Sequence, residues 1–555
     1  MRGIEAFLEI LAAADVRYIF GNPGKTELPL NDALAQDSRF QYILGIHGIP
    51  LTAMADGYAM ASGELGVVCV HICCGLDNAM GMLYNAYCAG TPLLLLAGQQ
   101  DRRLRFGESV LAGDMENVAR PWTKWSVEIN RVEDVPTATR RAIQVAMTPP
   151  TGPVSLSIPV DVQLEVAERF DLSPARVPDR HIRPPLKALH KAADMLLRAK
   201  NPAILAGSRV AEADAISELV ALAEQIGAPV LAESTTSHGR LPMPPAHPLY
   251  SGILPLWGTE VKECLQDFDT IFVVGMNLLR LYIYSGSDYP MHEHTRVIHL
   301  DIDSWEIGKN YPVELGIIGD LKASLAELVQ RLSSISFPDQ QEAAQKRHEQ
   351  YALQRASEHA KILAEMEQQR DLRPITPSTF MGVLANVLPP DSVIIEEAVT
   401  THNNILEKLE LLSDPNGHFS HRGWALGWGV GSAIGVKLAW PDRPVIALLG
   451  DGASLYGIQG LWTAAHYQLP IIFLIANNTQ YKILKVSGNV MDLPQMRQGH
   501  YLGMDLVSPE VNVVSLAQSF GVEGCRVTEP DELNERISNA LHRKKPLLLD
   551  VPIER

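Results

Sequence analysis

One strand–turn–helix–strand unit near the C-terminal end constrains the fold of this chain more than any other stretch. The apolar run Val445–Leu449 has the length of a strand and leads into a Gly-Asp-Gly turn. Apolar residues recur at helical spacing over Leu455–Tyr467, and a second strand-like run, Ile471–Ala476, ends in two asparagines. Such a crossover joins parallel strands, and ligands collect beyond the carboxyl ends of those strands. The unit predicts a parallel α/β architecture with polar groups gathered at one sheet edge.

The residues at these two strand ends suit a hard cation that carries a diphosphate. Asp451 offers a carboxylate oxygen, Asn478 offers an amide oxygen, and we expect a third ligand from the backbone carbonyl of Gln480. Mg²⁺ prefers oxygen ligands and is usually completed by phosphate and water. Gly450 and Gly452 allow the backbone to approach phosphates closely. The pattern therefore predicts a magnesium diphosphate site, and an ordinary βαβ unit with turn residues is the alternative.

Length and composition restrict the class of protein. A chain of 555 residues exceeds one hydrophobic core and favours three domains. The formal charge of −17 argues against nucleic acid or an anionic membrane as a partner. No apolar run reaches the roughly 18 residues of a membrane span, and the N-terminal stretch does not read as a secretory signal. The 6 cysteines lack disulfide or zinc spacing, so we expect a cytoplasmic protein.

Alternating strand and helix patterns divide the chain into three blocks, which we place at 1–170, 185–335 and 371–555. A proline-rich stretch, 168–185, and a charged helical stretch, 336–375, connect them. The alternation predicts an α/β fold of three doubly wound parallel-sheet domains. The second block has no GxGxxG after its first strand, so nothing in it indicates a nicotinamide site.

Several motifs together resemble one family. They are FGNPGKTELP (Phe20–Pro29), ADGYAMASG (Ala55–Gly63), LLLLAGQQDR (Leu93–Arg102), GLWTAAHYQLP (Gly460–Pro470) and the GDG…NN pair described above. Over nearly its whole length the chain resembles the thiamine diphosphate-dependent 2-oxo-acid decarboxylases and acetohydroxyacid synthases, and it looks most similar to the benzoylformate decarboxylase branch. The resemblance implies thiamine diphosphate and Mg²⁺ as cofactors and pyrimidine-binding, central and diphosphate-binding domains. It also implies a homodimer or homotetramer with active sites between subunits.

The family's activating glutamate is absent. It normally lies eight positions before the acidic residue of a [DE]GYA motif, and eight positions before Asp56 stands Gly48, preceded by His47. Three interpretations stay open. The enzyme works without the acid, as glyoxylate carboligase does; His47 or a water replaces it; or the protein is a weak or inactive relative. On an extended strand His47 would point away from the side of Gly48, which argues against simple replacement.

Further candidate residues come from the same resemblance. His71 matches a histidine that handles substrate carboxylate and protons, and its ordinary pKa suits that role, although a structural histidine is the alternative. Tyr282 stands where that branch has a second active-site histidine, and Lys25 replaces a serine that binds substrate carboxylate. His421 and Arg422 lie in a segment that is apolar in that branch. With Lys25 they predict a polar or anionic 2-oxo acid as readily as an aromatic one.

Three residues are expected at the cofactor. Leu426 aligns with the bulky residue that supports the bent cofactor, and Glu397 stands near the diphosphate end. Ala453 replaces a serine of the GDGS motif, which removes a phosphate hydrogen bond of about 0.5–1.5 kcal/mol.

The combined prediction is a lyase that uses thiamine diphosphate and Mg²⁺ to decarboxylate a 2-oxo acid, with carboligation as a second outcome. One alternative is a carboligase of the glyoxylate carboligase or acetolactate synthase type. Another, from a different class, is a cofactor-binding protein with little catalytic activity.

Overall fold

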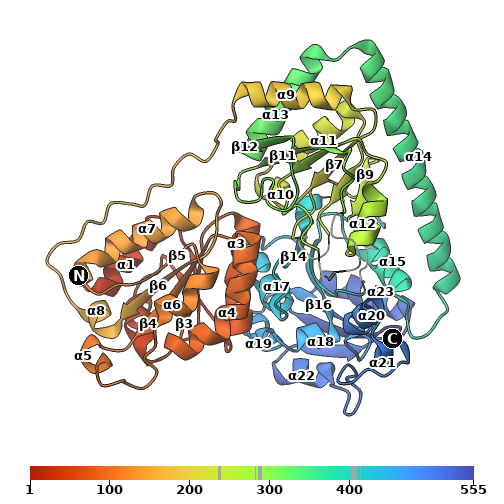
Figure 1. The fold of residues 1–555 in the computed structure, drawn as a ribbon. Coiled ribbons are helices and arrows are strands. Elements are labelled where there is room, and N and C mark those ends of the chain that lie inside the picture. The colour runs from red at the N-terminus through yellow and green to blue at the C-terminus, as the bar shows by residue number, and fades with distance from the viewer. Residues whose placement is uncertain (235–238, 282, 285–289, 402–408, 413) are drawn as a thin grey trace.

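Three parallel sheets of six strands each organise the chain, and helices cover their faces (Figure 1). The structure is a computed structural model that describes residues 1–555 except 235–238, 282, 285–289, 402–408 and 413. Each sheet falls inside one of the three predicted blocks, which confirms the α/β fold of three parallel-sheet domains, while the exact domain boundaries stay predictions. Within the described residues, no helix is both long enough and apolar enough to cross a membrane.

The N-terminal domain has the strand order β2-β1-β3-β4-β6-β5. Its strands are β1 (Tyr18–Gly21), β2 (Gln41–Leu44), β3 (Gly66–Val70), β4 (Leu93–Gln99), β5 (Trp125–Glu128) and β6 (Val154–Pro159). Its helices are α1 (Gly3–Ala12), α2 (Leu28–Leu34), α3 (Gly48–Ser62), α4 (Ile72–Ala89), α5 (Arg102–Arg105), α6 (Met115–Ala119), α7 (Val135–Met147) and α8 (Val160–Leu164).

The central domain has the order β12-β11-β10-β7-β8-β9. Its strands are β7 (Pro202–Ala206), β8 (Val230–Ala232), β9 (Tyr250–Ile253), β10 (Thr270–Val274), β11 (Arg296–Asp301) and β12 (Leu315–Ile318). Its helices are α9 (Leu186–Arg198), α10 (Arg209–Glu212), α11 (Ile216–Ile226), α12 (Gly258–Leu265) and α13 (Leu321–Ile335). The largely solvated helix α14 (Pro338–Gln369) then runs along the outer edge of the molecule to the C-terminal domain (Figure 1).

The C-terminal domain has the order β14-β13-β15-β16-β18-β17, which repeats the topology of the N-terminal domain. Its strands are β13 (Val393–Glu397), β14 (His418–Ser420), β15 (Val445–Gly450), β16 (Ile471–Asn477), β17 (Glu523–Arg526) and β18 (Leu547–Pro552). Its helices are α15 (Pro377–Val387), α17 (Trp428–Ala439), α18 (Asp451–Ser454), α19 (Gly460–His466), α20 (Lys482–Val490), α21 (Pro494–Arg497), α22 (Val513–Ser519) and α23 (Pro530–Leu541).

Helices α3 and α17 pack the N-terminal and C-terminal domains together within this one chain (Figure 1). Two glycines of α17 allow the close approach, because a Cβ at Gly431 or Gly435 would lie 2.2 or 1.9 Å from a carbonyl oxygen of α3. The indole Nε1 of Trp428 donates to Asp56 Oδ2 at 2.7 Å. These contacts fix the start of α3 relative to the loop that precedes α17.

One predicted local structure was wrong. The argument about His47 and Gly48 assumed an extended strand, but β2 ends at Leu44 and α3 begins at Gly48. His47 is instead the N-cap residue of α3, where its Nδ1 accepts from the Ile49 N–H at 3.2 Å.

Candidate active site

Polar residues gather where the strand order reverses in each sheet. In the N-terminal domain this point lies between β1 and β3, and in the C-terminal domain between β13 and β15. Ligands of open α/β sheets bind at such points, beyond the carboxyl ends of the strands. Gly24 and His71 follow the first pair of strands, whereas Glu397 ends β13 and Asp451 follows β15. The shared topology therefore places candidate site residues at the equivalent point of each domain.

The predicted metal ligands lie side by side. Gly450 pairs with Ala476 in the register of β15 and β16, so Asp451 and Asn478 stand at adjacent strand ends. Burial raises the pKa of the Asp451 carboxyl to about 6, and the backbone N–H groups around it oppose that rise. The Gln480 N–H donates to Asn478 Oδ1 at 3.1 Å, which holds the amide in place.

This donor set fits Mg²⁺ with a diphosphate. It offers carboxylate, amide and carbonyl oxygens, the ligand types that Mg²⁺ prefers. Among the described residues, no group of three or more His, Cys, Asp or Glu could hold a metal, so phosphate oxygens would have to complete the shell. A Cβ at Gly452 would lie 2.6 Å from Tyr481 Cε1, so the turn has no room for a side chain. Ala453 stands where a serine was expected, and the neighbouring Ser454 does not take over its role. The Ser454 hydroxyl donates instead to the Asp451 carbonyl at 2.8 Å.

His71 is held by a buried carboxylate that the sequence analysis did not single out. Glu27 is 2 % exposed, and its Oε2 lies 2.9 Å from His71 Nδ1. Its Oε1 accepts from the N–H groups of Ile72 at 3.1 Å and Gly98 at 2.9 Å. Because an ionised carboxylate only accepts, this pairing places the proton of a neutral His71 ring on Nδ1 and leaves Nε2 without one. A Cβ at Gly24 would lie 1.5 Å from this ring, which explains the glycine of the turn.

Gly48 is buried at the first position of α3 and faces α4. A Cβ there would lie 3.1 Å from the Cβ of Asn78, a residue that the sequence analysis also missed. His47 lies beside it, but its Nδ1 is occupied as the cap of α3. The position at which the sequence analysis expected a glutamate therefore holds a glycine beside the side chain of Asn78.

Glu397 contacts the N-terminus of α17. Its carboxylate accepts from the N–H groups of Gly427 at 2.8 Å, Trp428 at 3.0 Å and Gly429 at 3.0 Å. Burial raises the pKa of Glu397 to about 7, and these three N–H donors oppose the rise. Its oxygens thus hold the helix N-terminus, and its contact with the cofactor stays a prediction.

The loop between β14 and α17 carries three predicted site residues, His421, Arg422 and Leu426. The first two were expected to be positively charged toward the substrate, and neither offers an unpaired positive charge. Burial lowers the pKa of His421 to about 4, so this histidine is neutral at pH 7. Arg422 is 2 % exposed, and its Nη2 lies 3.2 Å from both Glu233 carboxylate oxygens. The prediction that both residues face an anionic substrate stays a prediction, and neither side chain brings an unpaired positive charge to it. Leu426 is half-buried in the same loop, Lys25 is exposed, and Tyr282 lies outside the described residues.

Comparison with known proteins identifies the class. Three models of the thiamine pyrophosphate enzymes match the chain: the N-terminal TPP binding domain at residues 1–117, the central domain at 189–328 and the C-terminal TPP binding domain at 399–551. The chain belongs to the thiamine diphosphate-dependent enzyme family. Within it, the chain is of the kind that breaks or forms carbon–carbon bonds, as the following relatives indicate.

Benzoylformate decarboxylase of Pseudomonas aeruginosa is 31% identical, with 99% of this chain and 98% of that protein covered. A probable acetolactate synthase large subunit of Methanocaldococcus jannaschii is also 31% identical, with 100% and 92% covered. The solved 4-hydroxybenzoylformate decarboxylase of Rhodococcus jostii RHA1 is 28% identical, with a TM-score of 0.87, and covers 100% of this chain and 99% of its own.

Proposed function

We propose that this chain uses thiamine diphosphate and Mg²⁺ to decarboxylate an aryl 2-oxo acid. The observation that carries the proposal is the placement of Asp451 and Asn478 at adjacent strand ends beside the Gly450–Gly452 turn. That arrangement offers a hard cation and a diphosphate the oxygens and the close backbone that they need. The similarity to decarboxylases over almost the whole chain supports the reaction class.

The chain's own residues would share the work as follows. Thiamine diphosphate, when bound, supplies the electron sink for decarboxylation. Asp451, Asn478 and the Gln480 carbonyl would hold Mg²⁺, and Leu426 would support the cofactor from the loop before α17. His71, oriented by Glu27, would transfer protons through Nε2 at the substrate. A positioned general acid–base group of this kind typically contributes about 10²–10⁴-fold.

The charge states of these side chains favour a substrate with one negative group. Three residues suggested a cationic pocket, but Arg422 is paired with Glu233 and His421 is neutral. Lys25 is the remaining cationic candidate of the three. We therefore favour uncharged aryl substituents over a second carboxylate, in keeping with the names of the decarboxylase relatives.

Carboligation is the second candidate function. Gly48 removes the acid that tunes the cofactor, and the sequence analysis left open an enzyme that works without it. The acetolactate synthase relative covers the whole chain at the same identity as the decarboxylase relative. Product analysis with and without an acceptor aldehyde separates the two functions.

We also propose a homodimer or homotetramer as the working form. Apolar side chains stand in solvent on the single chain, with Phe106 102% and Leu502 97% exposed. Contiguous exposed apolar surface marks interaction sites, and Leu104, Val110 and Leu111 are exposed in the same stretch as Phe106. Light scattering on the eluting protein would give the mass, and a monomer at micromolar concentration would contradict the proposal. Active sites shared between subunits and a cytoplasmic location stay predictions.

An acid quench tests the activity directly. Protein with thiamine diphosphate and Mg²⁺ is mixed with a panel of 2-oxo acids, and cofactor adducts are read by proton NMR. We expect adducts with benzoylformate-type acids and fewer with dicarboxylic ones. Absence of adducts with every acid would favour a cofactor-binding protein with little activity. The Gly48→Glu variant, run beside it, shows whether the missing acid limits the reaction.

A further inference from the structure

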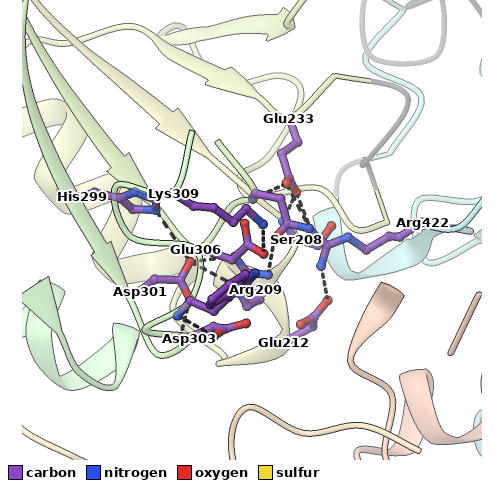
Figure 2. A network of polar contacts seen from close by, with 12 residues as sticks. Ser208, Arg209, Glu212, Glu233, His299, Asp301, Asp303, Glu306, Lys309 and Arg422 are labelled. Carbon is purple, nitrogen blue, oxygen red and sulfur yellow. Dashed lines mark hydrogen bonds and ion pairs between the residues drawn. The ribbon is translucent and has the colours of Figure 1, made fainter. Parts of the chain in front are cut away.

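A network of buried charges lies at the carboxyl ends of the central-domain strands (Figure 2). Arg209, which follows β7, donates through Nε and Nη2 to Asp301 Oδ2 at 3.2 and 2.7 Å. Its Nη1 donates to Asn277 Oδ1 at 2.8 Å. Asn277 follows β10, and the reversal of strand order lies between β7 and β10. Charged side chains thus occupy the point of this sheet where a ligand would be expected.

Glu233 extends this network out of the central domain. It follows β8 and is 1% exposed, and its Oε1 accepts from the Asn277 N–H at 2.7 Å. Its Oε2 accepts from the Ser208 N–H at 3.2 Å. Both oxygens lie 3.2 Å from Nη2 of Arg422, which belongs to the C-terminal domain (Figure 2). Two buried charges are tolerated only when each holds the other in good geometry, so Glu233 restrains where Arg422 lies.

The path of Arg422 to this carboxylate is built into the chain. A Cβ at Gly239 would lie 2.9 Å from both Cγ and Cδ of Arg422, so a side chain there would obstruct the arginine. The Gly239 carbonyl accepts from the Ser420 N–H at 2.9 Å, immediately before the loop begins. The Gly239 N–H donates to Ser208 Oγ at 2.8 Å. The central domain therefore holds both the entry of the loop and its arginine.

The loop at 421–427 is also held by the other two domains. Asn85 of the N-terminal domain bonds both backbone groups of Ala425, at 2.8 and 3.0 Å. Glu397 of the C-terminal domain accepts from the Gly427 N–H at 2.8 Å. Leu426 lies between these two anchored residues. Its position therefore depends on contacts with all three domains.

The geometry points to Glu233 as a positioning residue for the cofactor site. Through Arg422 it sets the position of the 421–427 loop, and so the place from which Leu426 would support thiamine diphosphate. This inference rests on the proposed function, in which Leu426 supports thiamine diphosphate. A displacement of about 1 Å in a positioned group can cost on the order of 10²-fold in rate.

The test compares Glu233→Gln with Asp301→Asn in the full-length protein. Each variant removes one central-domain carboxylate from a buried ion pair. Glu233 pairs with Arg422 of the loop, whereas Asp301 pairs with Arg209 inside the central domain. We expect Glu233→Gln to lower kcat about 10- to 100-fold and to leave KM for the 2-oxo acid within about twofold. It should also change the near-ultraviolet circular dichroism of bound thiamine diphosphate. Asp301→Asn should lower Tm and leave kcat within about twofold.

Amide hydrogen exchange of the 421–427 segment in cofactor-free protein gives an independent readout. We expect faster exchange in Glu233→Gln and in Arg422→Gln, and no increase in the double variant beyond that of Arg422→Gln, because Glu233 acts on the loop through Arg422. Unchanged exchange in Glu233→Gln, or equal loss of kcat in Asp301→Asn, would overturn the inference. Failure of the wild type to bind thiamine diphosphate would refute the proposed function instead, and the exchange data would still show whether Glu233 holds the loop.

Discussion

Replacement of Glu27 by glutamine should separate the orientation of His71 from its chemistry. Glutamine keeps the size of the side chain but replaces one acceptor oxygen with an NH₂ group. At Oε2 the carboxylate meets His71 Nδ1 at 2.9 Å and the Gly24 N–H at 3.1 Å, and at Oε1 it meets two further backbone donors. Whichever way the amide lies, at least one buried donor then faces another donor.

The structure sets the size of the expected effect. A hydrogen bond to a charged group contributes about 1.5–3 kcal/mol, and an unmatched buried donor costs about 1–3 kcal/mol. We therefore expect Glu27→Gln to lower the free energy of unfolding by about 3 kcal/mol. If the amide NH₂ faces Nδ1, the histidine is also driven toward the other tautomer, and proton transfer through Nε2 is lost. The rate should then fall by about 10²–10⁴-fold.

Urea denaturation gives the stability, and release of carbon dioxide from the best 2-oxo acid gives the rate. His71→Ala is the matched control, because it removes the same proton carrier and leaves Glu27 with its backbone donors. We expect a similar rate loss in His71→Ala with a smaller loss of stability, and a double variant no slower than either single one. A Glu27→Gln enzyme with the wild-type rate, or rate losses that multiply in the double variant, would refute this reasoning.

Three further variants probe other parts of the chain. Asp451→Ala should weaken Mg²⁺ binding, measured by calorimetry with thiamine diphosphate present. Loss of a residue that only supports a metal ligand lowers metal affinity roughly 10- to 100-fold, and loss of the ligand itself should lower it further. The Glu397 carboxyl has a pKa of about 7 in the folded protein, against an ordinary value of 4.5. The folded state therefore binds this proton more tightly than the unfolded state, and the free energy of unfolding falls as the pH rises between these two values. Glu397→Gln should flatten that part of the profile in urea denaturation at pH 5 and pH 8. Arg240 donates to the carbonyls of Met60 and Asn416 in the two other domains and lies over the Phe419 ring, so Arg240→Met should lower the free energy of unfolding by about 2 kcal/mol.

The parts of the site that were predictable depend on local pattern. Asp451 and Asn478 each follow a buried strand, and parallel strands end at the same edge of a sheet. Their positions could therefore be predicted without knowledge of contacts distant in sequence. The same pattern gave the three-sheet architecture. Local spacing thus carries the information for strand ends and for the groups that directly follow them.

The parts that were missed or wrong depend on contacts distant in sequence. Glu27 gains its role from Ile72 and Gly98, which lie on other strands and helices. Arg422 has no charged neighbour in its own motif, and its partner Glu233 belongs to another domain. No spacing rule links such residues, so the arginine was interpreted as a free charge. The feature that distinguishes Glu27 is its burial beside the Asn22–Gly24 turn, and burial is visible only in the structure.

Gly48 differs from the other glycines of the site, and this difference decides what its replacement can show. A Cβ would overlap neighbouring atoms at Gly24, at 1.5 Å, and at Gly435, at 1.9 Å, so packing alone demands glycine there. At Gly48 the nearest atoms would be the Asn78 Cβ at 3.1 Å and backbone atoms of Asn78 and Gly75 at 3.4 Å, so α4 would have to move by only a few tenths of an ångström. A side chain at position 48 therefore asks far less of the packing than one at Gly24 or Gly435. It follows that a rate change in Gly48→Glu would report on the chemistry of the cofactor and not on damage to the protein.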